Sequence, residues 1–213
     1  MKNKKAFNKA SMIAIAGVLF LSGGLMMIKD YKQLDNNFNV ISTTSDPDGN
    51  VITLTEPTWE SSGKNKAMTA EPLKTFEKDP TLTNVSNINL NGYFVVDIPV
   101  MTDDSSGTPE PVKKELFIMK NISSNVKEVG TAKEITEGDK TYKRHYFSVN
   151  NVLEKNSSIT LFDSVQMADL NLKEVKIVKG LNKIRVIGIG VQSEGVNKAV
   201  DQATIESYLS QVA

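Results

Sequence analysis

Leu90-Asn91-Gly92-Tyr93-Phe94-Val95-Val96-Asp97-Ile98-Pro99-Val100 is the stretch of sequence that decides the fold class. It is rich in β-branched and aromatic residues, which favour strands. Its centre, residues 93–96, is continuously apolar, as expected of a strand covered on both faces. A second run of this kind is Leu116-Phe117-Ile118-Met119. We expect these two runs to form the centre of one hydrophobic core.

Similar short runs recur on both sides of this stretch and are separated by Asn, Gly, Asp, Ser and Pro clusters. The expected strands are residues 38–42, 51–55, 81–84, 90–100, 114–122, 142–149, 158–162 and 183–192. About eight strands at this spacing predict an antiparallel β-sandwich of the jelly-roll type. Residues 61–70 and 102–111 lack apolar periodicity, so we expect both to be exposed loops.

The last predicted strand carries two glycines, Gly188 and Gly190, on one of its faces. Glycines at alternate positions leave a shallow trough that a second backbone can approach closely, so this strand is a candidate acceptor strand. Residues 196–212 are rich in helix formers after a candidate Asn197 cap. Their apolar residues do not share one face, so the predicted C-terminal helix either breaks near Thr204 or is covered on two sides.

The N-terminus has the pattern of an export signal. Four lysines lie within residues 1–9, and residues 10–28 form a 19-residue stretch without charge. Lysines before an apolar segment stay in the cytoplasm, so everything after Lys29 is expected outside the cell. We therefore predict a signal peptide or membrane anchor helix over residues 1–28 and one extracellular domain over residues 29–213. The alternative is a buried helix of a cytosolic domain.

Composition excludes several classes of function. Removing the five lysines up to Lys29 leaves 20 basic against 25 acidic residues, a net charge near −5 for the exported part. That balance argues against nucleic-acid binding. The chain has no cysteine, so it can form neither a disulfide framework nor a thiolate site.

Residues with catalytic or metal-binding chemistry are few, and we predict no enzyme activity, no cofactor and no metal site. His145 is the only histidine, and its neighbours indicate an ordinary strand position. A serine hydrolase built on it remains an alternative without a nucleophile-elbow pattern. Asp46, Asp48 and Asn50 have the alternate spacing of a calcium loop but favour a Pro-Gly turn. Trp59 is either a packing residue or a sugar-stacking platform.

Several strings, in order along the chain, resemble the TasA/camelysin family of exported surface and biofilm-matrix proteins. They are residues 23–30 with 36–40, Leu54-Thr55-Glu56-Pro57-Thr58-Trp59, Lys78-Asp79-Pro80-Thr81-Leu82-Thr83-Asn84, residues 161–165 and residues 187–192. They occur in the family's order and span most of the chain, although residues 101–160 contribute little. The resemblance implies a jelly-roll domain, found in Gram-positive bacteria, that assembles into extracellular fibres, and a signal peptide cut by the SipW type of signal peptidase.

The processing region implied by this resemblance is Gly24, Leu25, Met26 and Met27. Small residues are usual at such a cut, so the two methionines predict slow or partial cleavage and leave a persistent anchor as the alternative. The candidate assembly strand is Phe38-Asn39-Val40-Ile41-Ser42, which is uncharged and β-prone. The resemblance implies assembly that, in some members of the family, proceeds by lending an N-terminal strand to the next subunit. The expected partners are therefore other copies of this chain, signal peptidase, and the membrane through the N-terminal segment.

These features predict a non-enzymatic surface or matrix subunit that self-associates through β-strand edges. The alternative is a monomeric binding module that stays tethered to the membrane and contacts a ligand through the loops at residues 61–70 and 102–111.

Overall fold

The structure is a computed structural model of the 213-residue chain. It describes residues 11–12, 14–20, 24–26, 33–34, 52–63, 66, 72–103, 112–169, 184–193 and 201–212. The fold is mainly β, with antiparallel sheets, one of them curled into a half-barrel, and a short C-terminal helix. Every strand pair in the described part is antiparallel.

The main sheet is built around one long strand, β8 (Leu90–Asp103). Its strand order is β11-β13-β8-β16-β2-β3, with β12 paired to β13 and β9 paired to β8. The other strands are β2 (Ala14–Phe20), β3 (Gly24–Met26), β9 (Val112–Glu115), β11 (Val126–Glu128), β12 (Lys133–Glu137), β13 (Lys140–Val149) and β16 (Arg185–Gln192). Phe94 of β8 lies opposite Phe147 of β13 and Gly188 of β16, so these residues share one face.

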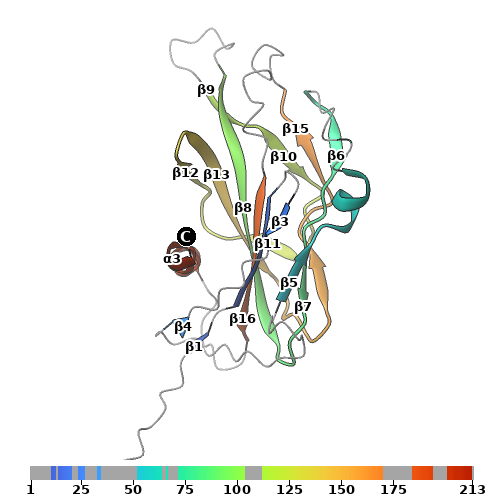
Figure 1. Cartoon of the computed structure of the whole chain (residues 1–213), viewed down its shortest axis with the longest axis vertical. Helices are drawn as coiled ribbons and strands as arrows, with labels where there is room; N and C mark the ends of the chain where they lie inside the picture. Colours follow the sequence, from blue (N-terminus) through green and yellow to red (C-terminus); the bar gives the residue numbers. More distant parts are fainter. Residues whose placement is uncertain are drawn as a thin grey trace, which may run out of the picture.

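A second layer covers this face of the main sheet (Figure 1). It consists of two three-stranded sheets, β10-β15-β6 and β14-β7-β5. Their strands are β5 (Ile52–Thr55), β6 (Thr75–Glu77), β7 (Thr81–Asn84), β10 (Phe117–Lys120), β14 (Ser158–Thr160) and β15 (Ser164–Met167). The amide of Lys78 donates to the carbonyl of Asp163 at 3.1 Å, and the amide of Leu161 donates to that of Pro80 at 2.9 Å. These two hydrogen bonds lie in the segments between β6 and β7 and between β14 and β15, so they connect the two small sheets to each other.

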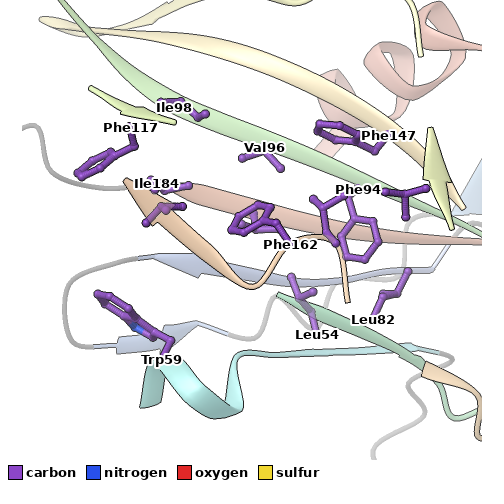
Figure 2. Packing of buried hydrophobic residues seen from close by; sticks show 14 of the residues in the cluster. Leu54, Trp59, Leu82, Phe94, Val96, Ile98, Phe117, Phe147, Phe162 and Ile184 are labelled. Carbon is purple, nitrogen blue, oxygen red and sulfur yellow. The ribbon is translucent and has the colours of Figure 1, made fainter. Parts of the chain in front are cut away.

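The hydrophobic core lies between the two layers. Figure 2 shows Phe94, Val96 and Ile98 of β8 pointing into the same interior as Leu54 of β5 and Leu82 of β7. All five side chains are buried. Complete burial of an aliphatic or aromatic side chain stabilises the fold by about 1.5–3 kcal/mol. Residues 93–96 are buried on both faces of β8, which confirms the expectation for this run.

The opposite face of the main sheet carries the helix α3 (Gln202–Val212) (Figure 1). Asp201 caps it by accepting a 2.9 Å hydrogen bond from the amide of Thr204. Ile205 and Leu209, four residues apart on one helix face, are buried. The side chain of Gln202 bonds both backbone groups of Thr131 at 3.0 Å, which fixes the start of the helix to the segment before β12.

The described strands confirm most of the predicted ones. The prediction that residues 116–119 form a strand buried on both faces is wrong. Leu116 and Phe117 are buried, whereas Ile118 is 46% exposed and Met119 is half-buried. Successive side chains of β10 point to opposite faces, and only the face that carries Phe117 and Met119 packs against the core. The predicted strand 114–122 is also divided at Leu116, whose amide bonds the carbonyl of Pro99 in the other layer at 2.8 Å. The predicted loop at residues 102–111 begins later, because β8 continues to Asp103.

The N-terminal segment enters the main sheet. Ala14–Phe20 form β2, which pairs with β16 on one side and β3 on the other. Ser11–Met12 (β1) pair with Gln33–Leu34 (β4). Among the described residues, none of the helices has the length and apolar character needed to cross a membrane. The role of residues 1–28 as a signal or anchor stays a prediction.

Candidate assembly surface

Both glycines of the candidate acceptor strand lie on the face of β16 that looks into the core. Gly188 pairs with Phe94 of β8, and Gly190 pairs with Gly92. A Cβ atom built on Gly190 would lie 2.7 Å from Cγ2 of Ile52 and 3.1 Å from Cδ1 of Leu90. The trough at Gly190 is therefore filled by a side chain of β5 from the chain's own second layer.

We expect Gly190→Ala to lower the free energy of unfolding by about 1–3 kcal/mol, because the added methyl group overpacks the core against Ile52. Urea denaturation measures this. The double variant Gly190→Ala with Ile52→Ala is expected to lose less than the sum of the two single losses, since removal of the Ile52 side chain makes room for the new methyl group. Additive losses would contradict this packing.

The edge of β16 that faces away from β8 accepts another strand. β2 pairs with it from Arg185 opposite Phe20 to Gly190 opposite Ala14, with a shift in register between Ile187 and Gly188. The occupant of this edge comes from the apolar stretch that the sequence predicts as an export segment. The acceptor edge and the predicted signal are thus in contact in the folded chain.

Of the residues predicted to govern processing and assembly, the structure describes only some. Gly24, Leu25 and Met26 form β3, opposite Phe20, Leu19 and Val18 of β2. Met27 and the whole candidate assembly strand, residues 38–42, lie outside the described residues. The Asp46–Asn50 turn lies outside them as well. What these segments do therefore stays a prediction.

A second strand edge lies beside an apolar groove. Among the strands that the structure describes, β10 pairs only with β15, so its other edge carries no ladder. A groove of about 540 Å³ runs along it between the two layers. Its lining includes Ile98, Phe117, Ile118, Met119, Ile122 and His145. Ile118 of β10 and Ile122 just after it are each nearly half exposed, so both add apolar surface to the groove beside this edge.

His145 lies at the wall of this groove, on β13, and its ring bridges two strands. Nε2 is 3.0 Å from a carboxylate oxygen of Glu115 on β9, and Nδ1 is 3.0 Å from one of Glu128 on β11. Burial of the ring opposes a positive charge, but the two carboxylate bonds outweigh it and raise the pKa of His145 above its usual 6.5. Both ring nitrogens of His145 therefore face carboxylates.

Two of the strings that carry the family resemblance meet at a buried ion pair. Lys78, which is completely buried, contacts the carboxylate of Glu56, also buried. The Lys78 ammonium lies 5.4 Å from the centre of the Trp59 ring. Burial lowers the pKa of Lys78 and raises the pKa of Glu56, against the attraction between the two groups.

Asp79, next to Lys78, holds the helical turn η1 (Trp59–Gly63) in place. Its carboxylate accepts hydrogen bonds from the amides of Thr58 at 2.9 Å and Trp59 at 3.1 Å. Trp59 is buried and packs against Phe76, with the ring centres 6.1 Å apart. The structure thus confirms Trp59 as a packing residue, and the buried charges of both strings have a structural role.

A second charge cluster, centred on the buried Asp97, connects four strands of the main sheet on the face opposite the core. Asp97 of β8, 1% exposed, accepts two hydrogen bonds from Arg144 of β13, at 2.6 and 2.8 Å. It accepts a third from Arg185 of β16 at 2.7 Å. Arg185 also pairs with Glu137 of β12, and its guanidinium lies 4.2 Å from the centre of the Tyr142 ring.

The helix α3 is fastened to the same face. Lys133 of β12 lies 2.7 Å from the carboxylate of Glu206. Burial, and a hydrogen bond to Glu206, raise the pKa of Tyr146 to about 12. Tyr146 is therefore neutral at physiological pH, and its hydroxyl group donates a hydrogen bond to the carboxylate of Glu206.

A polar groove of about 680 Å³ lies at the junction of the two small sheets. Its lining is Thr58, Thr75, Phe76, Glu77, Asp79, Asn121, Thr160, Asp163 and Ser164. Asp163 accepts hydrogen bonds from the Asn121 amide at 3.0 and 3.1 Å, and Asp79 is engaged by η1. Within the described ranges, no three His, Cys, Asp or Glu side chains are arranged to hold a metal ion.

Sequence reasoning missed the charged residues that the structure buries. Asp97 interrupts the apolar run of residues 93–100, and this interruption was the one available signal that a charge lies within the core strand. Lys78 and Glu56 stand among polar neighbours, and nothing in the local pattern indicates burial. Glu115 and Glu128 are 30 and 17 residues from His145, so only the fold brings them together.

Comparison with known proteins gives no relative for this chain. No protein-family model, no curated protein and no solved structure matches it. The resemblance to TasA and camelysin therefore rests on the quoted strings and stays a prediction.

Proposed function

We propose that this chain is an exported, non-enzymatic structural subunit of the cell surface or of an extracellular matrix, and that it self-associates through β-strand edges. The observation that carries this proposal is the pairing of β2 with β16. This pairing supports the idea that the edge of β16 that faces away from β8 can bind an apolar, antiparallel strand from the N-terminal part of a chain.

Processing would change the occupant of this edge. A cut by signal peptidase within Gly24-Leu25-Met26-Met27 removes β2 and leaves β16 with one unpaired side. An unpaired edge beside buried apolar residues readily accepts a strand from another molecule. The candidate donor is Phe38–Ser42, which follows the cut by about a dozen residues. In this scheme the two layers form a jelly-roll-like sandwich that the lent strand completes.

The free energies are sufficient for such an exchange. Each backbone hydrogen bond of a lent five-residue strand contributes about 0.5–1.5 kcal/mol net. Burial of Phe38 and Val40 adds about 1.5–3 kcal/mol for each side chain. Association costs about 4 kcal/mol or more in lost freedom of motion, so the strand outweighs this cost when most of its bonds form.

The alternative function is a membrane-tethered, monomeric binding module. Met26 and Met27 favour it, because bulky residues at the cut oppose processing. The polar groove at the junction of the small sheets also favours it, since threonine, asparagine and carboxylate side chains there suit a polar ligand. In this case residues 10–28 form an anchor helix in the membrane and do not occupy the places of β2 and β3 in the main sheet.

The state of the N-terminus in cells distinguishes these functions. N-terminal sequencing of extracellular protein is expected to show cleavage near Met26, and the cleaved protein is expected to sediment as concentration-dependent polymers. Val40→Pro should abolish the polymers, because proline removes a backbone donor and disrupts a central strand. The folded monomer should remain.

Asn36→Pro is the matched control, since it places the same residue in the same segment but before the candidate strand. It should leave polymerisation intact. If cleaved protein remains monomeric at high concentration, assembly through this strand is wrong. An uncleaved protein recovered only from membranes would favour the tethered module.

A further inference from the structure

The ring of His145 lies between two carboxylates that come from different strands. Glu115 of β9 and Glu128 of β11 each lie 3.0 Å from one ring nitrogen. A neutral imidazole carries one N–H, so it can donate to only one of them and turns a lone pair toward the other. Only the doubly protonated ring satisfies both carboxylates. The arrangement is therefore specific for the imidazolium form.

We propose that His145 is a pH-sensitive clasp: with both nitrogens protonated it ties β9 and β11 to β13, and loss of one proton releases at least one of these two strands. In the described part of the chain, β9 pairs only with β8 and β11 pairs only with β13. The His145 ring adds one side-chain connection between β9 and β13 and one between β11 and β13 to these backbone ladders.

The surroundings of His145 make it responsive to pH. The ring of Phe147 stacks on that of His145, with the ring centres 6.4 Å apart. Val96 of β8 lies opposite His145 in the sheet. The charged residues that line the same groove are Lys114, Glu115 and Asp169. The neighbouring strands also carry Lys113 of β9, Lys127 and Glu128 of β11, Lys133, Glu134 and Glu137 of β12, and Lys140, Lys143 and Arg144 of β13. Lys113 engages Glu134 at 2.5 Å. Among the described residues, Glu115 and Glu128 are the two whose carboxylates bond the ring.

The clasp also forms part of the wall of the apolar groove beside β10. His145 and Glu115 both line it, together with the exposed Ile118 and Ile122. Release of Glu115 loosens this wall on the side of β9. The shape of the groove therefore depends on the protonation of one residue.

The pH range follows from the direction of the shift. Contact with two carboxylates raises the folded-state pKa above the unfolded value near 6.5. The stabilisation by the clasp is therefore complete below about pH 6.5 and is lost as pH rises through the folded-state pKa.

Because this is the only histidine, the full chain labelled on histidine gives one Cε1–H signal by NMR. We expect its titration midpoint above 6.5, and we expect Glu115→Gln and Glu128→Gln each to lower it. Glu134→Gln is the control, because it removes a carboxylate on the neighbouring strand that does not bond the ring. It should leave the midpoint unchanged.

Amide hydrogen exchange tests whether loss of a proton from His145 releases β9 or β11. After correction for the intrinsic pH dependence of exchange, protection of β9 and β11 should fall as pH rises through the measured midpoint, while β7 stays protected. His145→Gln should show low protection in β9 and β11 at every pH. A midpoint at or below 6.5, or a midpoint unaffected by both glutamine variants, would overturn the proposal. Protection of both strands that does not change with pH would do the same.

Discussion

Replacing Asp97 with asparagine is expected to lower the free energy of unfolding by about 3–5 kcal/mol, the usual loss when one member of a buried ion cluster is removed. Asp97 is 1% exposed and accepts three hydrogen bonds from Arg144 and Arg185. Its neutral replacement leaves the buried guanidinium of Arg185 with Glu137 and the partly buried guanidinium of Arg144 without the charge of Asp97. Among the described residues, the buried Nε of Arg185 has no hydrogen-bond partner.

Urea denaturation of the full chain measures this loss, with Asp139→Asn as the matched control. Asp139 lies in the turn between β12 and β13 and is exposed, so its replacement removes the same charge without burying a partner. We expect a change within about 0.5 kcal/mol for the control. Equal losses in the two variants would mean that net charge, and not the buried cluster, determines the effect.

Lys78→Met is expected to cost a similar amount, about 3–5 kcal/mol, because it leaves the carboxylate of Glu56 buried without a cation. The double variant Glu56→Leu with Lys78→Met should recover most of this loss, since a well-packed apolar pair needs no compensation for desolvation. Thermal or urea unfolding of the single and double variants measures the coupling between the two residues.

The loss in Lys78→Met should depend on pH in a defined direction. Burial raises the pKa of Glu56 above its usual 4.5, so the carboxyl group is protonated more readily in the folded state than in the unfolded chain. The cost of the variant is therefore small below about pH 4.5 and grows as pH rises toward the folded-state pKa.

The exposed pair Lys66 and Glu77 provides the control for this experiment. Its side chains are 56% and 35% exposed. Lys66→Met should change the free energy of unfolding by no more than about 1 kcal/mol, because solvent screens an exposed pair. If Lys78→Met costs no more than Lys66→Met, the buried pair does not stabilise the junction between the small sheets.

The short strings that suggested a family also have a physical explanation in this fold. Glu56 and Lys78 pair inside the second layer, and Asp79 caps the turn that carries Trp59. The two strings are about twenty residues apart and act as one unit. A sequence pattern can therefore identify residues that belong together before it indicates what they do.

The sequence by itself determined the class of structure. β-Branched and aromatic runs placed β5, β7, β8, β13 and β16 close to their observed bounds, because period and composition are local properties. The absence of cysteine left packing and backbone pairing to stabilise the fold. The burial of residues 93–96 followed from the same local reasoning.

The tertiary structure decided which apolar runs are buried and which charges meet. Leu116–Met119 has the composition of a strand covered on both faces, but the chain breaks between β9 and β10 at Leu116, and Ile118 of β10 points away from the core. An uncharged stretch such as Ala14–Phe20 suits a membrane helix and a sheet strand equally well, and its pairing with β16 depends on a partner about 170 residues away. Asp97 with its arginines, Lys78 with Glu56, and His145 with two glutamates are juxtaposed by strand register. Local sequence contains no information about register between distant strands.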